Sequence, residues 1–302
     1  MEKDIHDRRD DNARADLPDA VGPATNMALF THASHATWFT DMNNFPCKLP
    51  EAKPSFGAMS APLMPYVLTL IAPRTETSLT STLISRARNA VDGGSPVVLS
   101  PNEAVDIPCP RQPDQERLAA ALNGAKVDAI VVPAANRRKR LLVADMDGTI
   151  ITGETTDELA AHAGLKQQVA EITMRGMNGE IDFRSGLRER VAMLKGLPIS
   201  ALEATWRSTT LTEGARELVS TMRANGAMTV LVSGGFSYFT SRLGALLGFD
   251  ETHANILELD NDRIAGRVAE PILDRCSKRS TLLRATKSKG LNPEQTLAVG
   301  AV

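Results

Sequence analysis

The 302-residue sequence predicts an α/β protein with two folded domains, the second built on an open parallel sheet with a helical insertion. Two observations support this fold class. Short uninterrupted apolar runs, such as residues 141–144, are typical of buried strands in parallel sheets. Upstream of them, strand-like and helix-like patterns follow one another in the order βαββαβ, which is a ferredoxin-like arrangement. The length of the chain also agrees with two domains.

The N-terminal segment, residues 1–63, is expected to be a largely disordered extension. It begins with mixed charges and continues as an irregular stretch with Asn, Ser, Thr and Pro, without a helical or strand period. The pattern changes abruptly at Tyr66, where a strand-like apolar run begins. This change favours the hypothesis that the natural start of the protein is Met59 or Met64.

The next segment, residues 64–136, is predicted to form the ferredoxin-like domain. Its expected elements are a strand, a helix, two strands, a helix and a strand, at residues 66–72, 78–91, 96–100, 104–107, 113–123 and 127–132. The arrangement resembles the amino-acid-binding ACT regulatory domain, and this resemblance rests on the fold alone. A dimerisation or packing module without a ligand is an equally good interpretation.

Charge and hydropathy exclude several classes of partner. The formal net charge of −2 gives no support for binding to nucleic acid or to a membrane surface. The one strongly basic run, Arg137–Arg140, directly precedes a buried strand and is interpreted as a solvated linker. The sequence contains no apolar stretch of the ~18 residues that span a bilayer and no secretory signal. Its three widely spaced cysteines predict free thiols and a cytoplasmic location.

The predicted strand at residues 141–144 ends in two carboxylates one residue apart, Asp145 and Asp147. Ligand sites of open α/β sheets lie beyond the carboxyl ends of the strands. An aspartate there could attack a phosphoryl group, while a second acid protonates the leaving alkoxide and later deprotonates water. Mg²⁺ is commonly held by one or two carboxylates together with a phosphate. The alternative is that Asp-x-Asp-Gly only marks the turn after the strand.

A second buried strand, residues 228–232, is followed by Ser233, Gly234 and Gly235 and then by a helical pattern at 236–247. A hydroxyl and backbone N–H groups at such a junction can cradle an anion. Lys278 opens a helical segment at 278–285 and could neutralise a phosphate as a point charge. Residues 296–300 form a third strand pattern of the same character.

The acidic pair, the Ser-Gly-Gly sequence and the lysine, in this order, resemble the haloacid dehalogenase superfamily of phosphatases. Within it, the chain is similar to the phosphoserine phosphatase family over roughly residues 140–300, with matching motifs at 152–160, 175–183, 187–191 and 194–197. The resemblance implies a doubly wound parallel sheet at residues 137–302, with a helical cap at about 155–212. The pattern itself adds a helix near 213–225 and a hairpin at 256–271, turning at 260–262.

The resemblance also implies the site residues. Asp145 would be the nucleophile and a Mg²⁺ ligand, and Asp147 would be the proton donor and a Mg²⁺ ligand through its backbone carbonyl. The remaining residues would bind O-phosphoserine: Ser233, Gly234 and Lys278 its phosphate, Glu154 its ammonium group, Arg190 its carboxylate, and Met177 and Phe183 its apolar side.

Each substrate residue also has an ordinary structural interpretation. Glu154 could be a first-turn acid that complements a helix dipole. Arg190 could be the partner of a surface ion pair, and Met177 and Phe183 could belong to the core.

The implied function is hydrolysis of O-phosphoserine to serine and phosphate in serine biosynthesis. A homodimer and serine binding at the ACT-like domain are further expectations. Another small zwitterionic phosphomonoester is the alternative substrate. In one respect the sequence departs from the family: Ala301 stands where an acid that binds Mg²⁺ is expected, and Val302 is the last residue. We therefore expect a truncated chain with impaired activity, or a non-catalytic remnant that binds amino acids or phosphate.

Overall fold

The computed structural model describes residues 64–73 and 79–300. The expectations for residues 1–63 and for Ala301 lie outside the described residues. Within them, the chain forms two sheets of four strands each and one two-stranded hairpin. No helix in the described ranges is long and apolar enough to cross a membrane.

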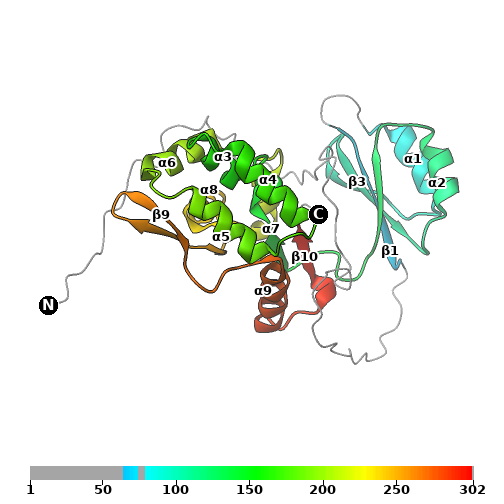
Figure 1. The fold of residues 1–302 in the computed structure, drawn as a ribbon. Helices are drawn as coiled ribbons and strands as arrows, with labels where there is room; N and C mark the ends of the chain where they lie inside the picture. Colours follow the sequence, from blue (N-terminus) through cyan, green and yellow to red (C-terminus); the bar gives the residue numbers. More distant parts are fainter. Residues whose placement is uncertain (1–63, 74–78, 301–302) are drawn as a thin grey trace.

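The first sheet confirms the ferredoxin-like arrangement (Figure 1). Its strand order is β2-β3-β1-β4, and every neighbouring pair is antiparallel. The elements are β1 (Tyr66–Ile71), α1 (Ser81–Ala90), β2 (Val97–Ser100), β3 (Ala104–Cys109), α2 (Gln115–Leu122) and β4 (Asp128–Pro133). Both helices pack on one face, where Leu83 of α1 and Leu118 of α2 share a core with Leu68, Leu70 and Ile107.

The basic run after β4 is only partly solvated, whereas the sequence had suggested a solvated linker: Arg138 and Arg140 are exposed, but Arg137 and Lys139 are not. Arg137 forms a salt bridge with Asp106 on the face of the sheet opposite the helices, with N–O distances of 2.5 and 2.6 Å, and also donates to Thr69. Lys139 Nζ donates to the Glu294 carbonyl at 2.6 Å. Arg137 and Lys139 therefore tie the run to two separate parts of the chain, and Arg137 supplies an ionic partner for the buried Asp106.

The second sheet has the order β10-β5-β6-β7, with all strands parallel. Its strands are β5 (Leu141–Ala144), β6 (Met228–Phe236), β7 (Glu251–Asn255) and β10 (Thr296–Val299). Successive residues of β5 enter different cores: Leu142 meets the cluster of α7 (Ala215–Ala224) and α8 (Ser237–Leu247), whereas Leu141 meets that of α9 (Arg275–Ser288). The sheet is thus covered on both faces, as predicted.

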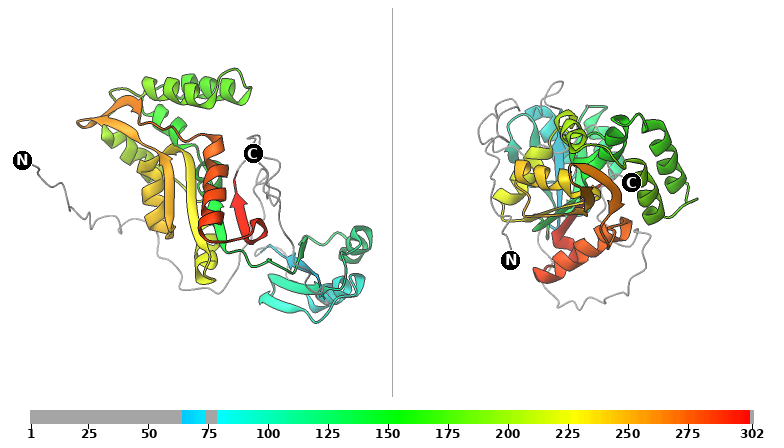
Figure 2. Two further views of the ribbon diagram at one scale, coloured as in Figure 1. Left: turned by 90° about the horizontal axis from the view of Figure 1, so that it is seen from below. Right: turned by 60° about the vertical axis from the view of Figure 1, so that its left-hand side comes forward.

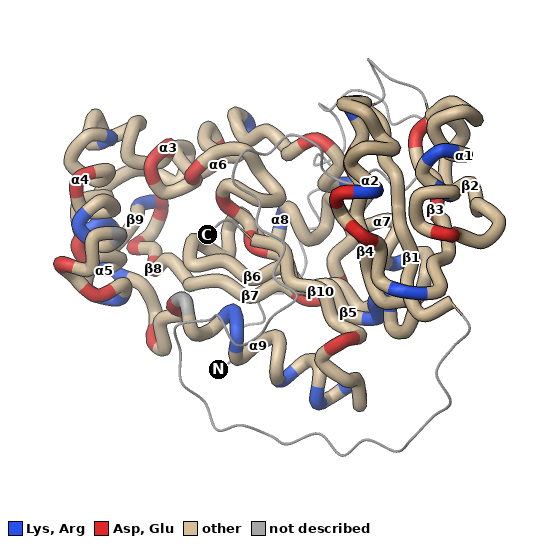
Figure 3. Tube along the Cα trace, turned by 90° about the vertical axis from the view of Figure 1, so that its right-hand side faces the viewer, with Lys and Arg blue, Asp and Glu red and all other residues tan. Residues whose placement is uncertain are grey.

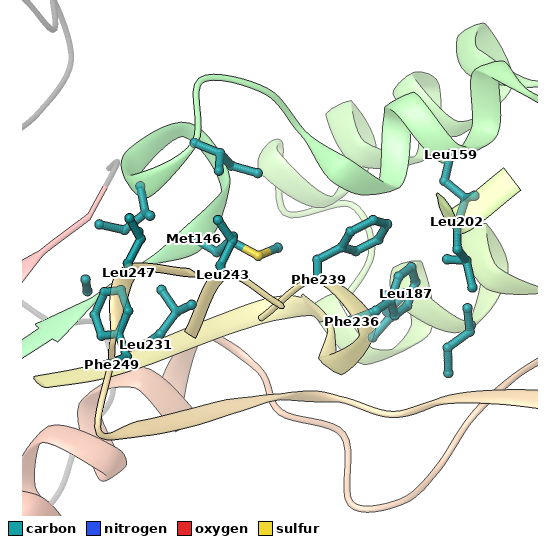
Figure 4. Packing of buried hydrophobic residues seen from close by; sticks show 14 of the residues in the cluster. Met146, Leu159, Leu187, Leu202, Leu231, Phe236, Phe239, Leu243, Leu247 and Phe249 are labelled. Atoms are coloured by element: carbon teal, nitrogen blue, oxygen red, sulfur yellow. The ribbon is translucent and has the colours of Figure 1, made fainter. Parts of the chain in front are cut away.

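The helical cap lies in the chain between β5 and α7 and sits across one end of the parallel sheet (Figure 2). Its helices are α3 (Thr155–Ala161), α4 (Lys166–Met177), α5 (Phe183–Met193) and α6 (Ile199–Ser208). Leu159, Leu187 and Leu202 of the cap share one apolar cluster with Phe236 and Phe239 of the sheet domain (Figure 4). The cap and the sheet domain are therefore joined by a continuous core on this side.

The predicted hairpin is confirmed as β8 (Leu257–Asp260) and β9 (Arg263–Val268), and β9 packs against α5. Two short helical turns, Met146–Ile150 and Pro293–Gln295, complete the described elements. Basic and acidic residues occur together along α4 and α5 (Figure 3). Cys109 is a buried free thiol, as expected.

Candidate active site

Asp145 is held at the carboxyl end of β5 by both its backbone and its side chain. Its N–H donates to the Val299 carbonyl at 2.9 Å, and its Oδ1 accepts from the Met146 N–H at 2.9 Å. Its Oδ2 forms an ion pair with Lys278. The side chain keeps 11% of its surface exposed, so the carboxylate is fixed and yet accessible.

Asp147 emerges from a turn in which Gly148 has a φ of 63°, a conformation that glycine adopts readily. Its Oδ1 accepts hydrogen bonds from the N–H and the hydroxyl of Thr155, both at 2.8 Å. Its Oδ2 accepts from the Ser233 hydroxyl at 3.1 Å. Burial and the nearby charge of Asp145 raise the pKa of Asp147, while these hydrogen bonds oppose the shift. The site therefore favours a protonated Asp147 more than water does.

The Ser233–Gly235 segment lies directly beside Asp147. Ser233 Oγ accepts from the Gly235 N–H at 2.8 Å, and a Cβ atom at Gly235 would lie 3.2 Å from Asp147 Oδ2. Strand pairing resumes after an irregularity, at Phe236 with Asn255, so β6 extends beyond its predicted end at residue 232. The physical reason is that the Asn255 amide donates to the Gly234 carbonyl at 2.8 Å and keeps the segment next to β7.

Lys278 reaches Asp145 from the first turn of α9. The helix begins at Arg275, three residues before the predicted start at 278. Its N-terminus is a capping box, in which Asp274 accepts from the Ser277 N–H and the Ser277 hydroxyl accepts from the Asp274 N–H. This cap fixes the helix end and so the position from which the lysine extends.

Glu154, directly before α3, and Arg190, on α5, lie within electrostatic reach of each other. Glu154 directly precedes α3 and its side chain makes no capping hydrogen bond, so the charge of the carboxylate, and not a hydrogen bond, would complement the helix dipole in the alternative interpretation. Although the residue is exposed, loss of solvation around its carboxyl group, followed by the charges of Asp147, Asp157 and Asp145, raises the pKa of Glu154 to about 7. The charge of Arg190 opposes this shift.

Arg190 is oriented by long hydrogen bonds to Thr173 Oγ1 and to the Gly186 carbonyl, each of 3.4 Å. Burial lowers the pKa of its guanidinium, and the charges of Asp157, Glu154 and Asp147 oppose the shift in that order. Arg190 is half-buried and, within the described residues, its hydrogen bonds go to a carbonyl and a hydroxyl, which does not support its alternative as a partner in a surface ion pair.

Phe183, the first residue of α5, lies against Gly234. Its exposed fraction is 36%, so it is not a core residue. The side chain of Met177 is outside the described part of the structure. Two further residues of α5 form ion pairs with residues outside the cap: Arg184 contacts Asp274 at 3.0 Å and Arg188 contacts Glu270 at 2.5 Å.

Thr155 and Asn255 are parts of the site that the sequence did not single out. Asn255 is 2% exposed, and besides Gly234 it contacts Leu273 through both atoms of its amide, at 2.7 and 3.0 Å. Its position at the carboxyl end of a parallel strand was an available signal. Thr155 carried no such signal, because its partner Asp147 lies across a turn of irregular geometry.

The acidic pair fits a divalent cation bound with water and phosphate. Asp145 and Asp147 supply hard oxygen atoms, and their mutual repulsion contributes to the raised pKa of Asp147, so added positive charge would stabilise both carboxylates. Within residues 64–73 and 79–300, no group of three or more His, Cys, Asp or Glu side chains could enclose a metal ion. Mg²⁺ does not require such a group, since it often keeps several waters.

Comparison with known proteins agrees with this geometry. A family model described as haloacid dehalogenase-like hydrolase matches residues 142–300. The phosphoserine phosphatase of Archaeoglobus fulgidus is 42% identical over 188 residues, which are 62% of this chain and 55% of that protein. The chain spans about half the length of several curated relatives that it matches.

Two solved structures are similar as well. A probable phosphoserine phosphatase from Vibrio cholerae, in unliganded form, has a TM-score of 0.61 at 26% identity and covers 78% of this chain and 72% of that chain. A structure described as a phospho-aspartyl intermediate analogue of phosphoserine phosphatase has a TM-score of 0.50 at 36% identity. It covers 53% of this chain and 77% of that chain.

Proposed function

Because the chain belongs to the haloacid dehalogenase-like hydrolase family, we propose that it is a Mg²⁺-dependent phosphatase that hydrolyses O-phosphoserine to serine and phosphate. The observation that carries the substrate assignment is the placement of Glu154 and Arg190 within electrostatic reach of each other and of Asp147. One acidic and one basic side chain beside the two aspartates match a substrate that carries both an ammonium group and a carboxylate. A neutral sugar phosphate would leave both charges without partners.

Asp145 attacks phosphorus in the first step, and the bond between phosphorus and the serine oxygen breaks. Asp147 gives its proton to the departing oxygen, so that serine leaves as an alcohol. In the second step Asp147 takes a proton from water, the water oxygen attacks phosphorus, and Asp145 is released from the aspartyl-phosphate. The raised pKa of Asp147 suits both proton transfers, since the group must gain and lose a proton near neutral pH.

Lys278, Ser233 and the Gly234 N–H would hold the phosphate. The ion pair of Lys278 with Asp145 supports this role, because it places the cation beside the attacking oxygen. A bound Mg²⁺, held by Asp145 and the backbone carbonyl of Asp147, would neutralise charge on the phosphate. Phe183 would shield the reacting groups from water, together with Met177 in the role that the family resemblance implies.

The first domain is proposed to regulate the second. Its ferredoxin-like strand order supports an ACT-like module that binds serine, and a homodimer formed through it belongs to the same proposal. A cytoplasmic location would accompany a biosynthetic role. Saturable binding of serine to the full chain by calorimetry is the expected result, and no binding at millimolar serine would leave a packing module instead.

The test of the proposed function is phosphate release from O-phosphoserine, with and without Mg²⁺, by this chain and by Asp145→Asn. We expect Mg²⁺-dependent release that the substitution abolishes. Glu154→Gln and Arg190→Ala should raise KM for O-phosphoserine far more than for p-nitrophenyl phosphate, which lacks both charged groups. Equal effects on the two substrates would count against phosphoserine and favour another phosphomonoester.

A further inference from the structure

We propose that Thr155 is a positioning residue that aims Asp147 at the leaving oxygen of the substrate. The inference rests on the proposed function, in which Asp147 is the proton donor. Thr155 is 2% exposed and is the first residue of α3. Both of its donors, the N–H and the hydroxyl, point to the same atom, Oδ1 of Asp147, at 2.8 Å.

Because both donors of Thr155 bind Oδ1, the two oxygens of Asp147 have different roles. Oδ1 is fully engaged by Thr155 and is the atom that fixes the side chain. Oδ2 receives only the weaker 3.1 Å contact from Ser233, whose hydroxyl is also proposed to bind phosphate. When Ser233 turns to a phosphate, Thr155 alone keeps the carboxyl plane in place. Oδ2 is then the atom that carries and transfers the proton.

The two partners lie on different parts of the molecule. Asp147 follows β5 of the sheet domain, whereas Thr155 begins the first helix of the cap. The turn between them is closed by a hydrogen bond from the Gly148 N–H to the Gly153 carbonyl, at 3.2 Å. Glu154, the proposed partner of the substrate ammonium group, is the residue directly before Thr155. Substrate binding and proton donation are therefore set by neighbouring residues of one short segment.

This role predicts a dependence on the leaving group rather than a general loss of activity. An alkyl phosphate expels a poor leaving group that needs a proton, but p-nitrophenolate leaves without one. Thr155→Val keeps the shape and the N–H donor and removes the hydroxyl. Thr155→Ser keeps both donors. A control in the same helix is Thr156→Val, because Thr156 is also buried (7% exposed) but is not among the hydrogen-bond donors to Asp147 in the described structure.

The experiment measures kcat/KM for a series of alkyl and aryl phosphates in the full chain with Mg²⁺. This ratio reports the steps through cleavage of the ester bond and not the later hydrolysis of the aspartyl-phosphate. We expect Thr155→Val to lower kcat/KM on alkyl phosphates by about 10- to 100-fold. This loss is smaller than the full rate contribution of a general acid, because Asp147 itself is retained. On p-nitrophenyl phosphate the loss should stay within about threefold, while Thr155→Ser should follow the wild type.

The results separate this inference from the proposed function. An active wild type combined with equal losses on alkyl and aryl substrates in Thr155→Val would overturn the role of Thr155 alone. A wild type that cleaves alkyl phosphates without preferring O-phosphoserine would overturn the substrate assignment, and the series would still decide the role of Thr155. A wild type inert on every substrate would overturn both. Thr155→Ala repeats the test if the valine variant does not fold, as judged by thermal unfolding.

Discussion

The ring of Phe183 lies so close to Gly234 that a Cβ atom built on the glycine would be 2.8 Å from the ring Cζ. Phe183 begins a cap helix, and Gly234 belongs to the segment that is proposed to bind phosphate. The absence of a side chain at residue 234 is thus what permits the cap to approach the phosphate site this closely.

Substituting Gly234→Ala should therefore impair the enzyme through the cap. We expect kcat/KM for O-phosphoserine to fall by about 10- to 100-fold, because the methyl group displaces Phe183 and overpacking costs about 1–3 kcal/mol. Adding Phe183→Leu should restore part of the loss. Gly176→Ala is the matched control, since a Cβ there has nothing within 4 Å. Additive losses in the double variant would contradict a steric cause.

The substrate affinity should depend on the ionisation of Glu154. Its pKa is raised to about 7, so the carboxylate that attracts ammonium is present above pH 7 and is lost as the pH falls through it. We expect KM for O-phosphoserine to rise by roughly tenfold between pH 8 and pH 6, beyond any change in the substrate itself. In Glu154→Gln this extra dependence should vanish. An unchanged pH profile of KM in that variant would assign the titration to another group.

The salt bridge between Arg137 and Asp106 should contribute to stability. The side chain of Asp106 is 10% exposed, and Arg137→Met would leave its charge without an ionic partner. We expect a loss of about 2–4 kcal/mol in the free energy of unfolding measured with urea, somewhat below a fully buried pair because Arg137 is 28% exposed.

Two further variants test the cause of that loss. Arg138→Met changes an exposed neighbour of the same type and should shift stability by less than about 0.5 kcal/mol. Asp106→Leu combined with Arg137→Met should recover a substantial part of the loss, because an apolar pair avoids the uncompensated charge. Equal stability of the two single arginine variants would restore the interpretation of a solvated linker.

The ion pairs of Arg184 with Asp274 and of Arg188 with Glu270 should help to hold the cap closed without stabilising the fold much. Their side chains are largely exposed, apart from Asp274, so each pair is worth at most about 1 kcal/mol. We expect Arg188→Glu to lower kcat/KM about two- to fivefold at low salt, with little difference at ~1 M salt. The charge swap Arg188→Glu with Glu270→Arg should restore activity, and failure to do so would argue against the pair.

The sequence allowed the regular elements to be predicted because their signals are local. The apolar run of residues 141–144 lies in one window, and so does the strand–helix order of the first domain. Asp145 and Lys278 each lie in a local sequence motif as well. The parallel sheet and α9 bring these two motifs together. The roles carried over from the family resemblance remain proposals.

What could not be predicted depends on partners distant in the sequence. Arg137 appeared solvated because nothing in its own window indicates that Asp106 lies buried opposite it. Thr155 and Asn255 act through hydrogen bonds whose partners are set by tertiary structure. The start of α9 is a different case, since Asp274 at the N-cap is a local signal in the sequence for a helix that begins at Arg275.

The hydrogen bond from the Asp145 N–H to the Val299 carbonyl links positions about half the chain apart. A ribosome that has released residue 145 must still add the cap, β6, β7 and α9 before the strand that pairs with β5 on its other side exists. Pairing across such a separation is slow, because the chain loses the conformational entropy of a long loop before it gains the stabilising contacts. The proposed active site is therefore among the last parts of the molecule to form during synthesis.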